Sequence, residues 1–333
     1  MKAVIAIDSF KGHLTALEAA EEAASMIARR YPGIETDILP SSDGGEGFCS
    51  IVTEALGGRM IRTMVPDPLG RPIEAAYGLR GGTAVIECAA ASGLTLLTED
   101  ELDPMRASSR GTGALIADAI MRGCRDIYVG LGGSATVDGG LGILEALACA
   151  GKSGNGGSMD LETTIRLARS LAEGCRITAI CDVEATFCGP QGAAAVYGPQ
   201  KGASPQQVPV LDARLGALAG EYAKVLGRDV LTQKGTGAAG GMSGAIWSVL
   251  GGDIRPGADA VLDILDFEKH LEGADIVITG EGRLDAQTFQ GKLPYAVASR
   301  AKRKNPDTRV IAFVGISDYP EAVPPFDELI CRG

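Results

Sequence analysis

The sequence predicts an α/β protein of two domains, and three observations support that prediction. The chain has 333 residues, which exceeds the size at which one hydrophobic core usually keeps growing. Buried strand patterns alternate with helical patterns along most of its length, an order typical of parallel sheets covered by helices. Residues 59–87 instead read as short strands joined by tight turns, which marks the entry into a second, mixed domain.

The N-terminal elements read as a β-α-β unit. Apolar runs at 3–7 and 34–39 predict buried strands, and apolar residues at helical spacing over 17–30 predict the helix between them. The same patterns then predict, in order, a helix over 48–56 and strands over 60–65, 73–79 and 83–87.

Helices and strands alternate in the rest of the chain. The patterns predict helices over 113–121, 141–150, 208–226, 258–265 and 293–304, and strands over 127–129, 177–181, 276–278 and 310–314. No segment recurs at a fixed period of about 20 to 50 residues, which excludes a repeat architecture.

The charge balance excludes several classes of partner. The chain has 31 basic and 42 acidic side chains, a net charge of -11 and no basic stripe, and such a surface repels nucleic acid and anionic membranes. No apolar stretch reaches membrane-spanning length, and Met1-Lys2 leads directly into a strand-like run without a signal peptide. We expect a cytoplasmic protein with small-molecule ligands and no nucleic-acid or membrane partner, while its oligomeric state stays open.

The cysteines and histidines limit the possible chemistry. The eight cysteines contain no CxxC pair and lie mostly in apolar segments, which predicts buried thiols in a reducing compartment. His13 and His270 are the only histidines. A histidine-rich metal site is therefore excluded, and a Cys–His nucleophilic pair is not expected.

The most informative stretch is IVITGEGRLDAQTFQGK, residues 276–292. An apolar run ends there in Glu281, Arg283, Asp285 and Lys292, so both charge signs gather in one strand-to-helix connection. Open α/β sheets bind ligands outside the carboxyl ends of their strands, and the pattern therefore predicts a site. An internal arginine–carboxylate clamp is the structural alternative.

A second polar group of residues follows the first strand. Asp8, Ser9 and Lys11 precede a helix, where backbone N–H groups and the Lys11 ammonium can hold a phosphate. Capping of the helix by Ser9 or Thr15, with Lys11 solvated, explains the same residues equally well.

A third group lies in SSDGGEG, residues 41–47, where Asp43 and Glu46 sit on a glycine-rich backbone. A carboxylate in such a loop can bind Mg²⁺ or orient a hydroxyl nucleophile. The alternative makes Asp43 a helix N-cap and Glu46 its capping-box partner. Capping does not explain three glycines in four residues, so a functional role is favoured.

A longer glycine-rich loop, GLGGSATVDGG at residues 130–140, follows a strand and precedes a helix, the setting of a phosphate-binding loop. Gly130, Gly132 and Ala135 fit the loosest dinucleotide fingerprint, GxGxxA, but the acid expected about 20 residues later is missing. A dinucleotide-dependent oxidoreductase is therefore the weaker alternative. No P-loop motif occurs in the chain.

Two more glycine-rich segments follow. The segment 181–202 places Asp182 at a strand end and Lys201 in a rigid Gly/Pro frame, although two ordinary turns give much the same sequence. In GTGAAGGMSG, residues 235–244, small residues permit the close approach of a ligand or of another helix. Packing is the favoured explanation for that segment.

Acids and cations thus gather on glycine-rich loops, while no thiolate pair and no GxSxG elbow is available. Phosphoryl transfer suits this set of residues, because its catalysis is mostly positioning and charge neutralisation by Mg²⁺, Lys and Arg. The acceptor does not follow from the residues alone.

Nine segments, in order and covering nearly the whole chain, resemble the bacterial glycerate kinase type 1 family. They are AIDSFKGHLTALEAA, SDGGEG, DPLGRP, IECAAASGL, SRGTGALI, GLGGSATVDGGLGILEALA, GPQGAAAVYGPQKGAS, GTGAAGGMSGAI and TGEGRLDAQTFQGK. The resemblance implies a kinase that uses ATP and Mg²⁺ to phosphorylate D-glycerate, with 2-phosphoglycerate as the expected product.

The resemblance also implies the arrangement of the two α/β domains, with the active site between them. One domain is expected to be Rossmann- or flavodoxin-like, with a parallel sheet, and to consist of residues 1–58 and 275–333. The other is expected to hold a mixed sheet and to consist of residues 59–274.

Roles for individual residues follow from the same resemblance. Arg71 and Arg283 are the candidates for holding the glycerate carboxylate, and Asp43 is the candidate for orienting the attacking hydroxyl. The remaining candidates, by expected ligand, are Asp8, Ser9 and Lys292 for the substrate, Lys11, Gly132, Gly133, Ser134 and Lys201 for phosphates, and Asp182 and Glu281 for Mg²⁺.

Three departures from the family pattern support an alternative, a truncated and catalytically impaired relative that still binds a sugar acid or a nucleotide. Val137 stands where relatives carry Asn before Asp-Gly-Gly, and Val183-Glu184-Ala185 replaces a segment that contains Asn. The chain also ends soon after residues 310–314, where relatives continue through another strand and a closing helix.

Overall fold

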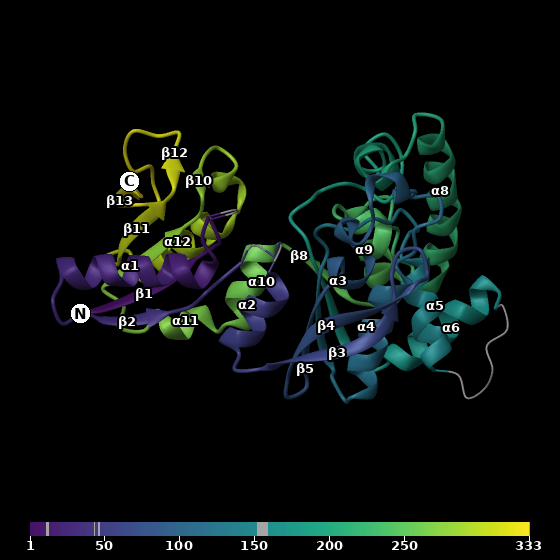
Figure 1. Ribbon diagram of the computed structural model, residues 1–333, viewed down its shortest axis with the longest axis horizontal. Coiled ribbons are helices and arrows are strands. Elements are labelled where there is room, and N and C mark those ends of the chain that lie inside the picture. Colours follow the sequence, from purple (N-terminus) through teal and green to yellow (C-terminus); the bar gives the residue numbers. More distant parts are fainter. Residues whose placement is uncertain (11–12, 43, 46, 152–158, 333) are drawn as a thin grey trace. The chain divides into compact units, whose positions relative to one another are not determined.

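The structure is a computed structural model that describes residues 1–10, 13–42, 44–45, 47–151 and 159–332. It contains two compact units, one formed by residues 1–57 and 256–333 and the other by residues 58–255 (Figure 1). Each unit has its own sheet and its own helices, which confirms the α/β class expected from the sequence.

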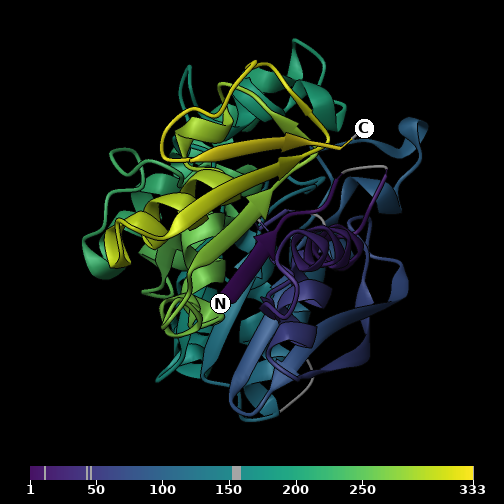
Figure 2. The same cartoon turned by 90° about the vertical axis from the view of Figure 1, so that its left-hand side faces the viewer.

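The first unit is built on a parallel sheet of five strands (Figure 2). These strands are β1 (Lys2–Ile7), β2 (Glu35–Ile38), β9 (Ile276–Gly280), β11 (Arg309–Val314) and β13 (Glu328–Cys331). The helices are α1 (Ala16–Arg30), α2 (Phe48–Ala55), α10 (Gly257–Ile264), α11 (Phe267–His270) and α12 (Leu293–Lys304). The short pair β10 (Arg283–Leu284) and β12 (Ile316–Ser317) and a 3₁₀ turn at Thr288–Gln290 complete the unit.

The strand order of this sheet is β13-β11-β9-β1-β2. Counted within the unit, that is the order 2-1-3-4-5 of flavodoxin-like folds, so the predicted Rossmann- or flavodoxin-like sheet is confirmed. The order reverses between β1 and β9, whose residues Ala3–Ile7 pair in parallel with Ile276–Gly280. Ligands of such sheets bind at the carboxyl ends of the strands at this switch point.

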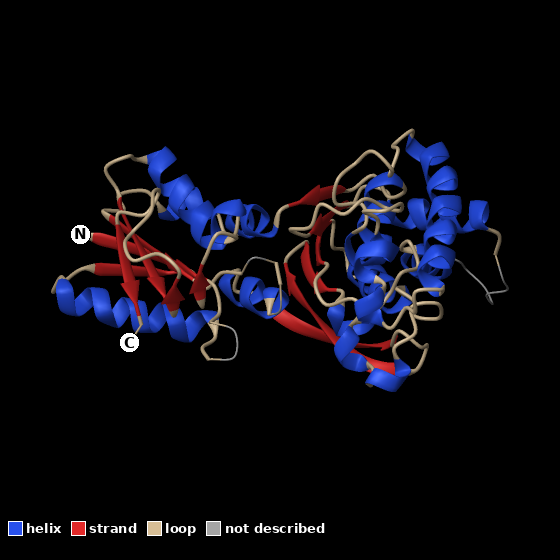
Figure 3. Ribbon diagram, turned by 90° about the horizontal axis from the view of Figure 1, so that it is seen from above, coloured by secondary structure: helices blue, strands red, loops and turns tan. Residues whose placement is uncertain are grey.

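Both faces of the sheet are covered by helices (Figure 3). Along β1, Ala3, Ile5 and Ile7 pack with the apolar side chains of α1 on one face. Val4 and Ala6 point to the opposite face and pack with residues of α10, α11 and α12. The continuous apolar run of β1 follows from this burial on both sides, since alternate side chains of a strand point to opposite faces.

The boundary between the units differs from the expected one. Residues 256–274, which the sequence assigned to the second domain, pack in the first unit. Arg300 of α12 connects this segment to the first unit. Its guanidinium donates to Asp259 and Asp263 of α10 and to Glu268 of α11. Residues 256–274 are therefore attached to the first unit by helix packing and by the buried Arg300 cation, and not by strand pairing.

The second unit is built on a mixed sheet of six strands. Its strands are β3 (Arg59–Pro66), β4 (Pro72–Arg80), β5 (Thr83–Glu87), β6 (Asp126–Gly130), β7 (Arg176–Ile180) and β8 (Asp253–Arg255). Its helices are α3 (Ala89–Ser92), α4 (Arg110–Met121), α5 (Leu141–Ala150), α6 (Leu161–Ala172), α7 (Ala193–Tyr197), α8 (Gln207–Leu226) and α9 (Ala238–Ser248). Three 3₁₀ turns lie at Leu94–Leu96, Glu99–Glu101 and Pro199–Lys201.

The six strands lie in the order β3-β4-β5-β6-β7-β8. Strands β3, β4 and β5 are antiparallel neighbours, whereas β5 to β8 are parallel, so the expected mixed sheet is confirmed. The sequence patterns did not place several elements that the structure contains, namely α3, α6, α7, α9, α11, β8, β10, β12 and β13. In the part of the chain that is described, none of the helices is both long enough and apolar enough to cross a membrane.

Candidate functional site

Glu281 directly follows β9, at the switch point of the first unit's sheet. The residue is 9% exposed, and its Oε1 accepts a hydrogen bond of 2.5 Å from Thr288 Oγ1. Its Oε2 lies 3.6 Å from Lys292 Nζ. Burial raises the pKa of the Glu281 carboxyl, and the Thr288 bond and the Lys292 charge oppose that rise. Two of the predicted site residues therefore meet here, and Thr288 is a third polar partner that the sequence did not single out.

Asp8 and Ser9 lie beside the same strand end. The Asp8 backbone N–H donates to Gly280 O over 3.1 Å, and the Asp8 carboxylate accepts from the Ser9 N–H over 2.7 Å. Helix α1 is capped by Thr15 rather than by Ser9, in a capping box with Glu18. Asp8 and Ser9 are thus left outside the helix cap. The third member of this group, Lys11, lies outside the described residues.

Arg283 does form an arginine–carboxylate pair, but with a residue distant in the sequence. Its Nη2 donates to Asp318 Oδ1 over 2.7 Å, and both side chains are about half exposed. The two acids nearest to Arg283 in the sequence, Glu281 and Asp285, do not bond to it. Its Nε and Nη1 have no bonded partner among the residues that the structure describes, so this guanidinium retains free donors.

Packing explains Gly280 of this strand-end motif and the nearby Gly315. A Cβ atom on Gly280 would lie 1.7 Å from Phe313 O of β11, and one on Gly315 would lie 2.5 Å from Gly282 O. The backbones of β9 and β11 approach each other too closely for a side chain. Glycine at these positions therefore reflects the sheet and does not by itself point to a ligand.

The segment 41–47 is only partly described. Helix α2 begins at Phe48, and its N-cap is Gly47, whose φ of 84° is left-handed and which makes no side-chain cap. Gly47 thus occupies the N-cap position, for which the capping alternative required Asp43. Gly44 also has a positive φ of 88°, so this loop needs glycine for its backbone. Asp43 and Glu46 themselves lie outside the described residues, and the role of Asp43 stays a prediction.

In the second unit, residues 131–140 connect β6 to α5 and contain the predicted phosphate loop. Gly133 has a left-handed φ of 72°. Among the described residues, no partner bonds the backbone N–H groups of Gly132, Gly133 and Ser134. Successive free N–H groups at a strand end form the kind of concavity that binds anions. Helix α5 begins only at Leu141, whereas the dinucleotide fingerprint opens a helix directly.

Lys201 reaches this loop from the turn Pro199–Lys201. Its Nζ donates to Ser134 Oγ and to Thr136 O, both over 2.8 Å, and the residue is 3% exposed. Burial lowers the pKa of Lys201 to about 8. Two residues predicted to face phosphates, Lys201 and Ser134, are therefore in direct contact.

Asp182 and two departures from the family pattern, Val137 and Glu184, lie in the loops that follow β6 and β7. Asp182 is exposed just beyond β7, and β7 is the parallel neighbour of β6, so both strands end at the same edge of the sheet. Val137 is 3% exposed and packs in the core of the unit. Glu184 is exposed and pairs with Lys234 over 2.8 Å. The Val137 departure is therefore at a packing position.

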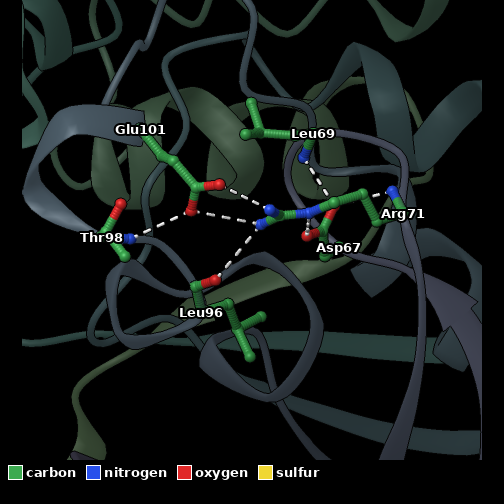
Figure 4. A network of polar contacts seen from close by, with 6 residues as sticks. All are labelled: Asp67, Leu69, Arg71, Leu96, Thr98 and Glu101. Carbon is green, nitrogen blue, oxygen red and sulfur yellow. Dashed lines mark hydrogen bonds and ion pairs between the residues drawn. The ribbon is translucent and has the colours of Figure 1, made fainter.

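Arg71 lies in a network of its own within the second unit (Figure 4). Its Nε donates to Asp67 Oδ2 over 2.5 Å, and its Nη1 donates to Glu101 Oε1 over 2.6 Å. The Asp67 side chain is 2% exposed, and its Oδ1 also accepts from the N–H groups of Leu69 and Arg71. Asp67 belongs to the DPLGRP segment quoted for the family resemblance, but the sequence did not single it out, and nothing local indicated Glu101.

The described residues offer few ready-made metal sites. No group of three or more His, Cys, Asp or Glu side chains among them is arranged to hold a metal ion. The eight cysteines are free thiols. Asp182 belongs to the second unit and Glu281 to the first, so these two metal candidates lie in different units.

Comparisons with known proteins identify the family. The sequence model of the glycerate kinase family matches residues 3–324. A protein of Bacillus subtilis named glycerate kinase is 42% identical over 326 residues, which cover 95% of this chain and 85% of that protein. A protein of Escherichia coli K12 named glycerate 2-kinase is 39% identical over 314 residues, which cover 91% of this chain and 82% of that protein.

A solved structure agrees with these sequence matches. The crystal structure of putative glycerate kinase 2 from Salmonella typhimurium LT2 is 40% identical and superposes with a TM-score of 0.86. The match covers 99% of this chain and 90% of that one. With a family match along nearly all of its length and relatives at about these identities, the chain belongs to the glycerate kinase family.

Proposed function

We propose that this protein is a kinase that transfers the terminal phosphate of ATP to D-glycerate and releases 2-phosphoglycerate and ADP. Membership of the glycerate kinase family supports this proposal, and one relative is named glycerate 2-kinase. The transfer forms a bond between a glycerate hydroxyl oxygen and the phosphorus, and it breaks the bond from that phosphorus to ADP. The hydroxyl proton passes to a base.

The observation that carries the proposal is the loop at Gly132, Gly133 and Ser134. Its N–H groups have no partner within the described part of the chain. The Lys201 ammonium donates a hydrogen bond to the Ser134 hydroxyl of this loop. Phosphoryl transfer depends mainly on donors that are already fixed around the phosphate oxygens. We assign this loop to the phosphates of ATP.

For the substrate carboxylate, Arg283 is the stronger of the two arginine candidates. A single carboxylate, that of Asp318, holds Arg283, and a second carboxylate can still bind its free Nε and Nη1. Arg71 already bonds to both Asp67 and Glu101, so it can bind glycerate only by releasing Glu101. Lys292, Asp8 and Ser9 are proposed to complete the substrate site at the switch point of the first unit.

We further propose that Asp43 accepts the hydroxyl proton and that Lys11 faces the transferred phosphate. A carboxylate within hydrogen-bond reach of the acceptor hydroxyl is the usual base for this step. An Asp43→Asn substitution is expected to lower kcat by about 100-fold or more, the typical contribution of a general base. Near-normal turnover in this variant removes Asp43 from that role.

Mg²⁺ is proposed as the cofactor, and the donor set fits a common way of binding it. Mg²⁺ in kinases is usually held by one or two carboxylates together with the substrate phosphates. The carboxylates of Asp182 and Glu281 are the candidates for that role, although Glu281 already bonds to Thr288 and lies near Lys292. When bound, the ion would neutralise phosphate charge. A cytoplasmic setting, without nucleic-acid or membrane partners, is part of the same proposal.

The deciding experiment measures ADP release with D-glycerate and MgATP. Release that depends on D-glycerate supports the proposal, whereas binding of both ligands without ADP release refutes it. The site of phosphorylation follows from ³¹P NMR of the product, because phosphorus on the C2 oxygen couples to one proton and phosphorus on the C3 oxygen couples to two. Arg283→Lys is expected to raise the KM for glycerate, whereas Arg62→Lys, at an exposed ion pair on β3, is the matched control.

A further inference from the structure

Lys201 is a buried cation that forms no ion pair with any acid in the described part of the chain, although Asp138 lies near enough to affect its pKa. Its ammonium bonds to one hydroxyl and one carbonyl, those of Ser134 and Thr136. No carboxylate among the described residues forms an ion pair with it. Burying a charged amine without a counter-ion is costly, so packing alone does not explain a lysine at this position. A lysine held in this way is a candidate for a functional task.

The direction of the Lys201–Ser134 hydrogen bond follows from the chemistry of an ammonium group. A charged lysine has three donors and no acceptor, whereas a serine hydroxyl has one donor and can also accept. The Ser134 oxygen must therefore accept from Lys201 Nζ at 2.8 Å. Its own hydrogen is left to point elsewhere, and no acceptor for it occurs in the part of the chain that the structure describes.

The same stretch carries further donors without partners. The N–H groups of Gly132, Gly133 and Ser134 are unbonded among the described residues. The oxygens of Gly132 and Gly133, in contrast, accept from Cys88 Sγ and from the Leu94 N–H. The loop therefore presents three N–H donors without partners, whereas the oxygens of Gly132 and Gly133 are already bonded, a pattern that favours an anion.

We propose that Lys201 is a positioning residue that fixes the Ser134 hydroxyl as an outward donor to a phosphate group of ATP. This inference rests on the proposed function of the loop. Lys201 acts through Ser134 and does not contact the phosphate itself. Lys201 is only 3% exposed, and two of the three N–H donors of its ammonium are already bonded. Ser134, which does touch the phosphate, is the binding residue.

A dependence on pH follows from the two states of the amine. A neutral lysine amine has a lone pair, so it can accept the Ser134 proton and turn that hydroxyl inward. Burial lowers the pKa of Lys201 to about 8, while the neighbouring Cys88 and Asp138 oppose this change. Burial also raises the pKa of the Cys88 thiol to about 12, so this neighbour stays neutral over the range in question. Affinity for the nucleotide should therefore fall as the pH rises through about 8.

The test measures MgATP affinity by calorimetry and KM and kcat by ADP release, for the full chain between about pH 6.5 and 9.5. Ser134→Ala is expected to weaken MgATP binding about tenfold, the value of one hydrogen bond to a charged acceptor, with little change in kcat. Lys201→Met is expected to have the same effect, and the double variant should be no weaker than either single one. Lys302→Met, which also removes a lysine that donates to a backbone carbonyl, is the control and should bind MgATP normally.

The pH profile separates positioning from a purely structural role. Wild-type affinity is expected to fall above about pH 8, whereas the affinity of Ser134→Ala should not show this step, because no hydroxyl remains to be turned. Because this comparison leaves Lys201 intact, it tests the positioning role of Lys201 even if Lys201→Met does not fold. Effects of the two substitutions that multiply, or the same pH step in Ser134→Ala, overturn the inference. Wild-type protein that binds no MgATP overturns the proposed function as well, whereas normal binding by both variants overturns only the role of Lys201.

Discussion

Arg300 of α12 donates from Nη1 to Asp263 of α10 over 2.6 Å, and this contact joins residues 256–274 to the first unit. The same guanidinium bonds to Asp259 and Glu268. Arg300 is 9% exposed, while its three carboxylate partners are each about half exposed. One buried cation thus holds three acids that lie on the surface of two neighbouring helices.

The first prediction concerns this cluster. Arg300→Met should lower the free energy of unfolding by about 2 to 3 kcal/mol, because it leaves three acids close together without their cation. Arg303→Met is the matched control, since Arg303 is exposed and lies 3.9 Å from Glu268. That control should cost less than about 0.5 kcal/mol. Urea unfolding of both variants measures the difference, and equal midpoints would show that the cluster contributes nothing.

The sequence predicted those parts of the fold that depend on residues close together in the chain, and it missed those that depend on contacts between distant residues. The run of apolar residues in β1 marked a strand buried on both faces, and the helical spacing over 17–30 marked α1, because both signals are local. The attachment of residues 256–274 was not predictable in this way. It depends on Arg300, about 40 positions further along the chain, and no local pattern indicates which acids a distant arginine will contact.

The candidate site shows the same limit. The sequence singled out Lys201 and Ser134 from their glycine-rich surroundings, but their contact spans 67 positions and only the fold reveals it. For Arg283 the sequence suggested a nearby acid, whereas the fold supplies Asp318. The glycines were misleading in part: Gly280 marks the close approach of β9 to the carbonyl of Phe313 and not a ligand.

The second prediction concerns Glu281, whose burial raises the pKa of its carboxyl. A folded-state pKa above the unfolded value of 4.5 means that the folded protein holds the proton longer, so wild-type stability falls as the pH rises through that window. A Glu281→Gln variant has no carboxyl to ionise, so its stability does not fall in this way, and its side-chain oxygen can still accept the hydrogen bond from Thr288. It should be more stable than wild type by about 1 kcal/mol near pH 7, and no more stable near pH 4.

The measurement is thermal or urea unfolding of wild type and Glu281→Gln at both pH values. A stability gain at neutral pH together with a loss of kinase activity would mean that the buried charge is kept for function at the expense of stability. A variant that is less stable than wild type at neutral pH contradicts the prediction.

The third prediction compares the two acids that hold Arg71. The Asp67 side chain is 2% exposed and that of Glu101 is 32% exposed. Burial tends to raise the pKa of Asp67, but hydrogen bonds from the backbone and side chain of Arg71 and from Leu69 outweigh it and lower the pKa. This stabilisation is present above the unfolded pKa of 3.8 and is lost as the pH falls through the lower, folded value.

Asp67→Asn should therefore cost about 1 to 2 kcal/mol at neutral pH, whereas Glu101→Gln should cost less than Asp67→Asn. Chemical denaturation near pH 7 tests the ranking, and the cost of Asp67→Asn should shrink in acid. A larger cost for Glu101→Gln would show that the exposed half of the network dominates.

The fourth prediction concerns the loop at residues 239–241, where α9 is interrupted. Ala239, Gly240 and Gly241 have positive φ values of 51°, 69° and 98°. A Cβ atom on Gly240 would lie 1.9 Å from Thr136 O, in the loop that also contains Ser134. Gly240→Ala should therefore cost more than about 3 kcal/mol or displace the loop. Gly220→Ala, in α8 with no atom near its Cβ position, should instead be neutral or stabilising.

The last prediction concerns Thr279 of β9, whose buried Oγ1 has no hydrogen-bond partner among the residues that the structure describes. Its neighbours in the sheet are Ala6 and Ala312, which belong to the apolar face under α12. An unpaired buried hydroxyl has lost its water without compensation, so Thr279→Val should raise the free energy of unfolding by about 1 kcal/mol. The control is Thr236→Val: Thr236 is fully buried, but its hydroxyl bonds to Val230 O and Gln233 O. That substitution should instead cost about 1 to 2 kcal/mol, and denaturant unfolding of the pair should give opposite signs. Destabilisation by both substitutions would mean that the Thr279 hydroxyl has a partner in solution, such as a bound water at the end of β9.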